Sequence, residues 1–189
     1  MFAPGVAPPT GKPSRAGCAL ALMALAGAVF AAVFLLVFLE SGADSGEVVL
    51  LDQRAYARGT ATHLPEHGLF LVRLGSGFVA LADVDAANRA AAGRRCRVHT
   101  IEGGTAATNG LLARYAGRSS PAAQGAVLLL GEDCNGAVYD IAGVRLDRDG
   151  PNLDRLAVAV NGRGRVVVSP LERTCTAREG SELAVPRAC

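Results

Sequence analysis

The sequence predicts an all-β domain, an antiparallel barrel or sandwich, behind one N-terminal transmembrane helix. The first observation is an uncharged apolar run over residues 16–39. The second is a series of short β-type runs after that stretch. Turn signals separate these runs, which is typical of antiparallel sheets and not of βαβ units. A chain of 189 residues has room for one ordinary domain and an appendage of this kind.

The apolar run has the length of a membrane anchor. Its 24 residues exceed the about 20 that cross a hydrocarbon core, whereas the apolar region of a cleaved signal peptide has only about 7–15. Residues 1–15 are rich in Pro and Gly and are expected to form a disordered tail, in which Lys12 and Arg15 favour the cytoplasmic side. We therefore expect a single-pass protein of the cell membrane, with a linker at residues 40–46 and an extracellular or periplasmic C-terminal domain.

The charge balance argues against one class of partner. Lys12 and Arg15 are two of the 19 basic residues, so the 17 that follow the apolar run equal the 17 acidic residues in number. A nucleic-acid binder needs a basic face. The exported part is neutral overall, and we expect no nucleic acid among its partners.

The β-type runs begin directly after the linker. Residues 68–74 and 78–82 flank a Gly75-Ser76-Gly77 turn, and residues 156–160 and 165–169 flank a second glycine-containing turn, so each pair is predicted to form a hairpin. The remaining candidate strands are residues 48–51, 97–101, 126–130 and 137–141.

Two segments depart from the strand pattern. Residues 85–93 are rich in Ala and predict a helical turn. Residues 103–125 are rich in Gly, Ala, Ser and Thr, and we interpret them as a partly mobile surface insertion whose anchors are Leu111, Leu112 and Tyr115.

Four cysteines lie in the exported part: Cys96, Cys134, Cys175 and Cys189. An even number in an oxidising compartment predicts disulfides, and four cysteines allow three pairings. Proximity in the sequence favours Cys175 with Cys189, and then Cys96 with Cys134. The alternative is a metal site, but no C-x-x-C pair is present, and Cys96 and His99 would point to opposite faces of a strand.

Histidines and acidic residues offer further candidates. His63 and His67 lie on either side of a Leu-Pro-Glu segment and could hold a metal together with Glu66, although Pro65 makes a solvated loop the stronger interpretation. Four acidic residues flank two of the predicted loops and are interpreted as solvated turn residues: Asp83, Asp85, Glu132 and Asp133. No nucleophile–base set or phosphate loop is evident, so we assign no catalytic residue and do not expect an enzyme acting on its own.

Several short motifs occur in the order of one known family. The first predicted hairpin precedes a loop, and residues 134–140 (CNGAVYD) form a second, C-x-G-containing loop. A Gly143-to-Leu146 turn, a Gly150-Pro151 pair and closing strands at residues 153–158 and 165–168 follow. Over residues 47–170 this order resembles a Rieske iron–sulfur domain, and the preceding anchor resembles that of the iron–sulfur subunits of cytochrome bc-type complexes. The resemblance implies a Rieske-like β-domain, with residues 171–189 as a tail outside it.

The resemblance also implies a ligand set that is incomplete in this chain. The family holds a [2Fe–2S] cluster with two Cys thiolates on one iron and two His imidazoles on the other. Cys134 falls on one ligand position, but Asn135 stands where the next His is required, and the C-x-H of the first loop aligns with Asp85-Ala86-Ala87. Cys96 and His99, with His63 or His67, would be needed for an atypical set. We therefore expect no cofactor, although the family implies [2Fe–2S].

Without a cluster, the resemblance gives the loop residues structural roles. Cys96 matches a non-ligand Cys of the first loop, and the hypothesis is that it forms a disulfide with Cys134 that links the loops. Asn135 and Asp140 would fix the second loop by side-chain hydrogen bonds to the backbone, and Tyr139 would pack against it. The other loop-structural residues implied are Gly136, Gly150 and Pro151.

Three functions follow from these patterns. The first is a membrane-anchored, cluster-free Rieske-like domain that acts as a structural or accessory subunit beside cytochrome b- or c-type respiratory subunits. The second is a genuine [2Fe–2S] electron-transfer subunit with atypical ligands. The third is an exported β-domain for protein binding, unrelated to redox chemistry. Function depends on the site and not on the fold alone, and the ligand count favours the first over the second.

Overall fold

The computed structural model describes residues 23, 25–34, 46–91 and 96–189, and the chain divides into two compact units, residues 1–44 and 45–189. In the first unit, residues 23 and 25–34 are helical, with exposed apolar side chains that include Met23 and Phe30. No helix within the described residues is long and apolar enough to span a membrane. Most of the predicted anchor, residues 16–39, lies outside them.

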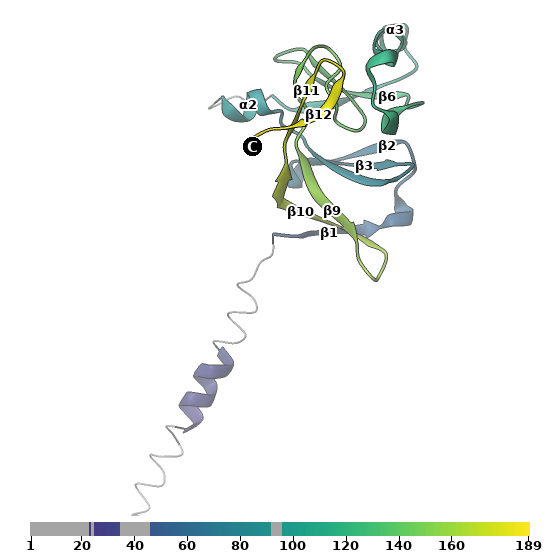
Figure 1. The fold of residues 1–189 in the computed structure, drawn as a ribbon. Helices are drawn as coiled ribbons and strands as arrows, with labels where there is room; N and C mark the ends of the chain where they lie inside the picture. Colours follow the sequence, from purple (N-terminus) through teal and green to yellow (C-terminus); the bar gives the residue numbers. More distant parts are fainter. Residues whose placement is uncertain (1–22, 24, 35–45, 92–95) are drawn as a thin grey trace, which may run out of the picture. The chain divides into compact units, whose positions relative to one another are not determined.

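A six-stranded antiparallel sheet that curves into a half-barrel forms the base of the second unit (Figure 1). Its strand order is β1-β10-β9-β4-β3-β2. The bounds are β1 Val48–Asp52, β2 Thr60–Leu64, β3 Leu69–Leu74, β4 Gly77–Ala82, β9 Arg155–Val160 and β10 Arg165–Thr174. The 3-10 turn η1 (Gln53–Ala55) follows β1, and η2 (Pro65–His67) joins β2 to β3.

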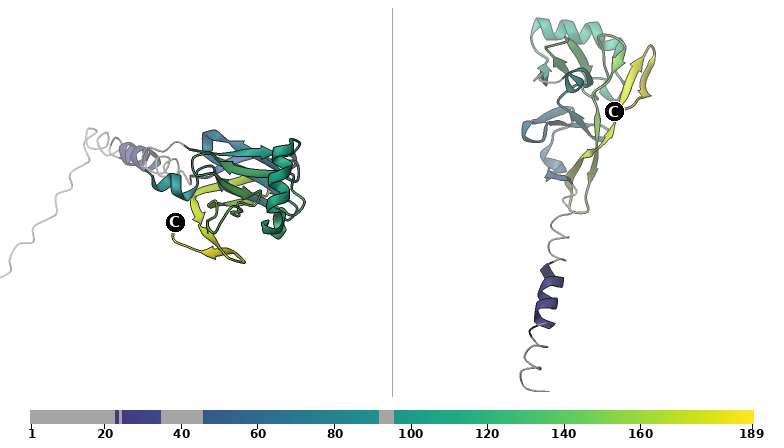
Figure 2. Two further views of the ribbon diagram at one scale, coloured as in Figure 1. Left: turned by 90° about the horizontal axis from the view of Figure 1, so that it is seen from above. Right: turned by 90° about the vertical axis from the view of Figure 1, so that its left-hand side faces the viewer.

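Two three-stranded antiparallel sheets complete the domain. One has the order β5-β6-β7, with bounds Val98–Glu102, Leu128–Glu132 and Ala137–Asp140. The other has the order β12-β11-β8, with bounds Glu182–Pro186, Thr176–Glu179 and Gly150–Pro151. Helix α2 (Ala86–Ala90) precedes β5, and α3 (Ala106–Tyr115) lies between β5 and β6, at the end of the domain away from β1 (Figures 1 and 2).

Strand β3 separates two hydrophobic cores. Side chains alternate along a strand, so Phe70 and Val72 point to one face and Leu69 and Leu71 to the other. The first face packs against β5, β6 and β7, through residues that include Leu130. The second packs inside the half-barrel with residues of β1, β9 and β10. All four of these β3 side chains are almost completely buried.

The mostly β, antiparallel fold class predicted from the sequence is confirmed. Both hairpins form, as β3–β4 and β9–β10, and β1, β5 and β7 lie within a residue or so of their predicted ranges. β6 begins two residues later than expected and continues to Glu132. β2 was not predicted, because its sequence TATHL is polar and only partly buried at the edge of the large sheet.

The segment at residues 103–125 is more regular than a surface insertion of loops. Thr105 caps α3 by accepting the backbone N–H of Thr108 at 3.1 Å. The three predicted anchors do pack inward: Tyr115 is buried, and Leu111 and Leu112 lie against the same cluster as Leu129 and Leu146.

The C-terminal tail is part of the domain. The side chain of Asn152 accepts the backbone N–H of Arg145 and donates to Thr176 and to the carbonyl of Leu183, which joins the β11–β12 hairpin to the preceding turn. A disulfide between Cys175 and Cys189 closes the tail, as proximity favoured. The two strands of the tail, β11 and β12, were not predicted, because they are short and rich in charge.

Asp154 is a buried carboxylate shared by three arginines. It ion-pairs with Arg89 of α2, with Arg187 of the tail at 3.2 Å and with Arg173 of β10 at 3.6 Å. Its side chain is completely buried, while the arginines are partly exposed. One carboxylate therefore connects three parts of the chain that are distant in sequence.

We predict that Asp154→Asn lowers the free energy of unfolding by about 2–4 kcal/mol, because three guanidinium groups lose their shared anion. Asp133→Asn is the matched control: the Asp133 side chain is 91 % exposed and lies 3.8 Å from His99, so its loss should cost less than about 0.5 kcal/mol. Denaturant titration of the full chain in detergent measures both. Equal effects would show that Asp154 does not hold these segments together.

Candidate functional site

The candidate site lies where two loops meet at one end of the β5–β6–β7 sheet. Loop one, residues 83–97, connects β4 to β5, and loop two, residues 133–136, connects β6 to β7. A disulfide between Cys96 and Cys134 joins the loops, with their Cα atoms 6.0 Å apart. The pairing that the sequence favoured is confirmed.

Glu132 fixes loop two. Its carboxylate accepts the backbone N–H groups of Cys134 at 2.7 Å and of Asn135 at 2.8 Å, and it is almost fully buried. Gly136 has φ +62°, a left-handed conformation that favours glycine and that closes the turn before β7. The Asn135 side chain was expected to fix this loop, but the Glu132 carboxylate supplies these two loop hydrogen bonds.

Two acids of loop one are buried rather than solvated, contrary to the sequence-based interpretation. Asp83 lies beside His63, whose Nε2 is 3.1 Å from its Oδ2, and beside the guanidinium of Arg97. Asp85 caps α2 by accepting the backbone N–H of Asn88 at 2.8 Å. These carboxylates are inside because each has a cationic or N–H partner there. Glu132 is likewise buried, and of the four acids expected to be solvated only Asp133 is.

Tyr139 of β7 contacts loop one from within the core. Its hydroxyl donates to Asp85 at 3.3 Å, and its ring is buried among the residues of the first core. Burial, reinforced by the Asp85 charge, raises the pKa of Tyr139 well above its usual range. Tyr139 therefore packs in the core, as its place in the sequence predicted, and it also donates a hydrogen bond to Asp85 that was not predicted.

The histidines do not converge on the cysteines. His63 is in β2 and stacks on Phe70, with ring centroids 4.3 Å apart, so its placement in a solvated loop was wrong. His67 is in η2, 3.8 Å from Glu66, and His99 pairs with Asp133 on the exposed side of β5. Within the described residues, the one group with metal-ligand spacing is Cys96, Glu132 and Cys134, and its two sulfurs are bonded to each other.

These donors do not fit a Rieske cluster. A cluster needs thiolates, and Cys134, which the sequence resemblance aligns with a ligand position, shares its sulfur with Cys96 in a disulfide. Asn135 stands where that resemblance requires a His, and Asp85 is used as a helix cap. The observed arrangement can hold two loops together covalently.

The remaining predicted loop residues stabilise the following turn. Asp140 accepts the backbone N–H groups of Ser120 at 2.8 Å, Ala142 at 2.9 Å and Val144 at 2.9 Å. Gly150 and Pro151 form β8 and pair with β11 of the tail. Asp140 therefore fixes the turn after β7 rather than loop two.

Arginines surround the base of loop one. A shallow cavity of about 270 Å³ is lined by residues that include His67, Asp83, Arg89, Arg97 and Arg173. Each of these arginines has a carboxylate partner, either Asp83 or Asp154. The cavity therefore contains an internally paired network, which stabilises the loop base.

Comparison with models of known protein families, with curated proteins and with solved structures found no match.

We predict that removing the loop disulfide (Cys96→Ser with Cys134→Ser) lowers the free energy of unfolding by about 4 kcal/mol, as the chain-entropy model gives for a separation of 38 residues. The tail disulfide encloses 14 residues, and its removal should cost about 3 kcal/mol. Denaturant titration measures both, and non-reducing peptide mapping of the wild type checks the pairing. Free thiols at Cys96 and Cys134 in the mapped protein would contradict it.

A second prediction follows from the raised pKa of Tyr139. The unfolded tyrosine ionises near pH 10, so stability from the neutral buried phenol is complete below about pH 10 and falls as pH rises above it. Tyr139→Phe should cost about 1 kcal/mol at neutral pH and flatten the fall above pH 10. Denaturant titration across this pH range tests it, and an unchanged alkaline slope in Tyr139→Phe would contradict it.

Proposed function

We propose that this chain is a membrane-anchored, Rieske-like protein that carries no cluster and serves as a structural or accessory subunit of a cytochrome bc-type respiratory complex. One observation carries the proposal: the cysteine at the only matching ligand position, Cys134, is joined to Cys96 in a disulfide. The cross-link supplies a constraint between the loops that a cluster would otherwise supply.

Two features support the Rieske-like part of the proposal. The antiparallel base sheet and the smaller β5–β6–β7 sheet bring together two loops from the positions where the sequence motifs placed them. The Glu132 carboxylate also accepts two backbone N–H groups of loop two, so that this loop keeps its shape without a bound metal. Anchoring rests on the uncharged run at residues 16–39.

A test is to purify the full chain anaerobically in mild detergent from its native membranes and to measure iron, acid-labile sulfide and the electron paramagnetic resonance of the reduced sample. We expect no stoichiometric iron or sulfide, and co-isolated haem-containing cytochrome b- or c-type subunits. A matched preparation of Cys134→Ser should have the same iron content.

Two results would overturn the proposal in different ways. Stoichiometric iron that is lost in Cys134→Ser would show the atypical electron-transfer subunit instead. An iron-free chain without any co-isolated haem protein would favour an exported domain that binds other partners.

A further inference from the structure

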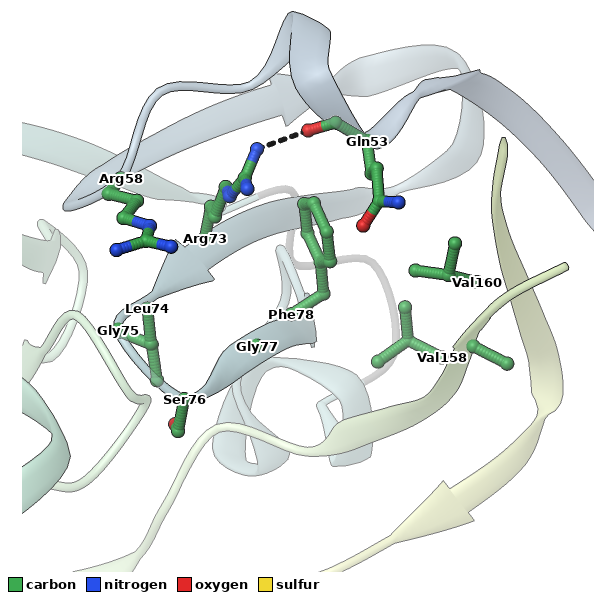
Figure 3. Close-up of a pocket in the computed structure, with 11 residues that line it drawn as sticks. Gln53, Arg58, Arg73, Leu74, Gly75, Ser76, Gly77, Phe78, Val158 and Val160 are labelled. Carbon is green, nitrogen blue, oxygen red and sulfur yellow. Dashed lines mark hydrogen bonds between the residues drawn. The ribbon is translucent and has the colours of Figure 1, made fainter. Parts of the chain in front are cut away.

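A second concave site lies at the β3–β4 turn, at the other end of this hairpin from loop one. It is a cavity of about 280 Å³ between the β3–β4 turn, the end of β9 and the segment after β1 (Figure 3). The lining residues that matter here are Arg58, Arg73, Phe78, Val158 and Val160. None of the loop-site residues lines it.

Arg73 is held in a fixed position at this cavity. Its Nη1 donates to the backbone carbonyls of Gln53 and of Tyr56, the latter at 2.8 Å, and its guanidinium carbon lies 5.3 Å from the centroid of the Phe78 ring. Carbonyls orient a guanidinium but do not neutralise it, so the positive charge remains available.

Arg58 adds a second cation at the same end of the cavity (Figure 3). Within the described part of the chain, neither Arg58 nor Arg73 has a carboxylate at ion-pair distance, and no acidic residue lines the cavity. The carboxylate of the neighbouring Asp52 accepts the backbone N–H of Arg54 at 2.8 Å. This contrasts with the three described arginines that line the cavity at loop one, Arg89, Arg97 and Arg173, each of which has a carboxylate partner.

The other end of the cavity is apolar. Figure 3 shows Val158 and Val160 on the side away from the two guanidinium groups, with the Phe78 ring between them and Arg73. The Phe78 ring is fixed edge-on against Tyr56, with centroids 5.8 Å apart. A small pocket with two cations at one end, one of them held in place, and an aromatic and aliphatic wall is the kind of site that binds an amphipathic anion.

We propose that this cavity binds a small organic carboxylate, with the carboxylate between Arg58 and Arg73 and a flat apolar body against Phe78. The planar carboxylate matches the fork of a guanidinium group. One negative group is enough for this site, because Arg73 already donates from Nη1 to two backbone carbonyls. This inference does not depend on the proposed respiratory role.

Isothermal titration of the full chain in phospholipid nanodiscs with benzoate tests the proposal. We expect saturable binding that is about tenfold weaker in Arg58→Gln, which removes one charged hydrogen-bonded contact, and weaker still for the neutral analogue benzamide, which removes the charged contacts to both arginines. Arg114→Gln is the control, since Arg114 is an exposed arginine on α3, outside the cavity, and its loss should leave benzoate binding unchanged.

Three results would overturn the proposal: no saturable benzoate binding, equal binding in wild type and Arg58→Gln, or displacement of benzoate by an equal concentration of inorganic phosphate. Displacement would show a site for phosphate groups instead. Circular dichroism of Arg58→Gln, whose side chain is exposed, checks that the variant is folded.

Discussion

Burial of β3 on both faces is the constraint on which the rest of the domain depends. A strand with one solvated face can slip by one residue at the cost of exposing its apolar side chains. In β3 a slip would exchange Phe70 and Val72 with Leu69 and Leu71, two sets of different shape that pack in different cores. The register of β2 and β4 against β3 is thereby fixed, and so are the positions of loop one and of the β3–β4 turn.

Each of the two concave sites follows from this register, at opposite ends of the same hairpin. Loop one begins at Asp83, directly after β4, and the cavity lined by Arg58 and Arg73 lies at the β3–β4 turn. Arg73 is the only charged residue of β3, and its position near the turn lets its guanidinium reach the carbonyls after β1. A charge inside an otherwise apolar strand is a signal in the sequence that could have identified this site.

The parts of the fold that were predictable are those in which apolar runs end at clear turn signals. β3, β4, β9 and the start of β10 are such runs, and their hairpins were predicted at nearly the correct residues. β2, β11 and β12 depend instead on backbone pairing with a neighbour, which leaves no periodic signal in TATHL or in the charged tail. Proximity in the sequence was sufficient for both disulfides, because each joins one cysteine of the exported part to the next one along the chain.

The carboxylates were the least predictable part of the candidate site. Asp83, Asp85 and Glu132 lie at strand ends, where acids are usually solvated, but each is buried against a partner that comes from another element or from its own turn. Glu132 is the most informative of them. It lies two residues before Cys134, within reach of both sulfurs, yet its oxygens are occupied by the N–H groups of loop two. An acid that holds a turn in place is a weaker metal ligand, because an ion would compete with the two N–H groups for the same oxygens. The loop therefore keeps its form through a disulfide and a carboxylate.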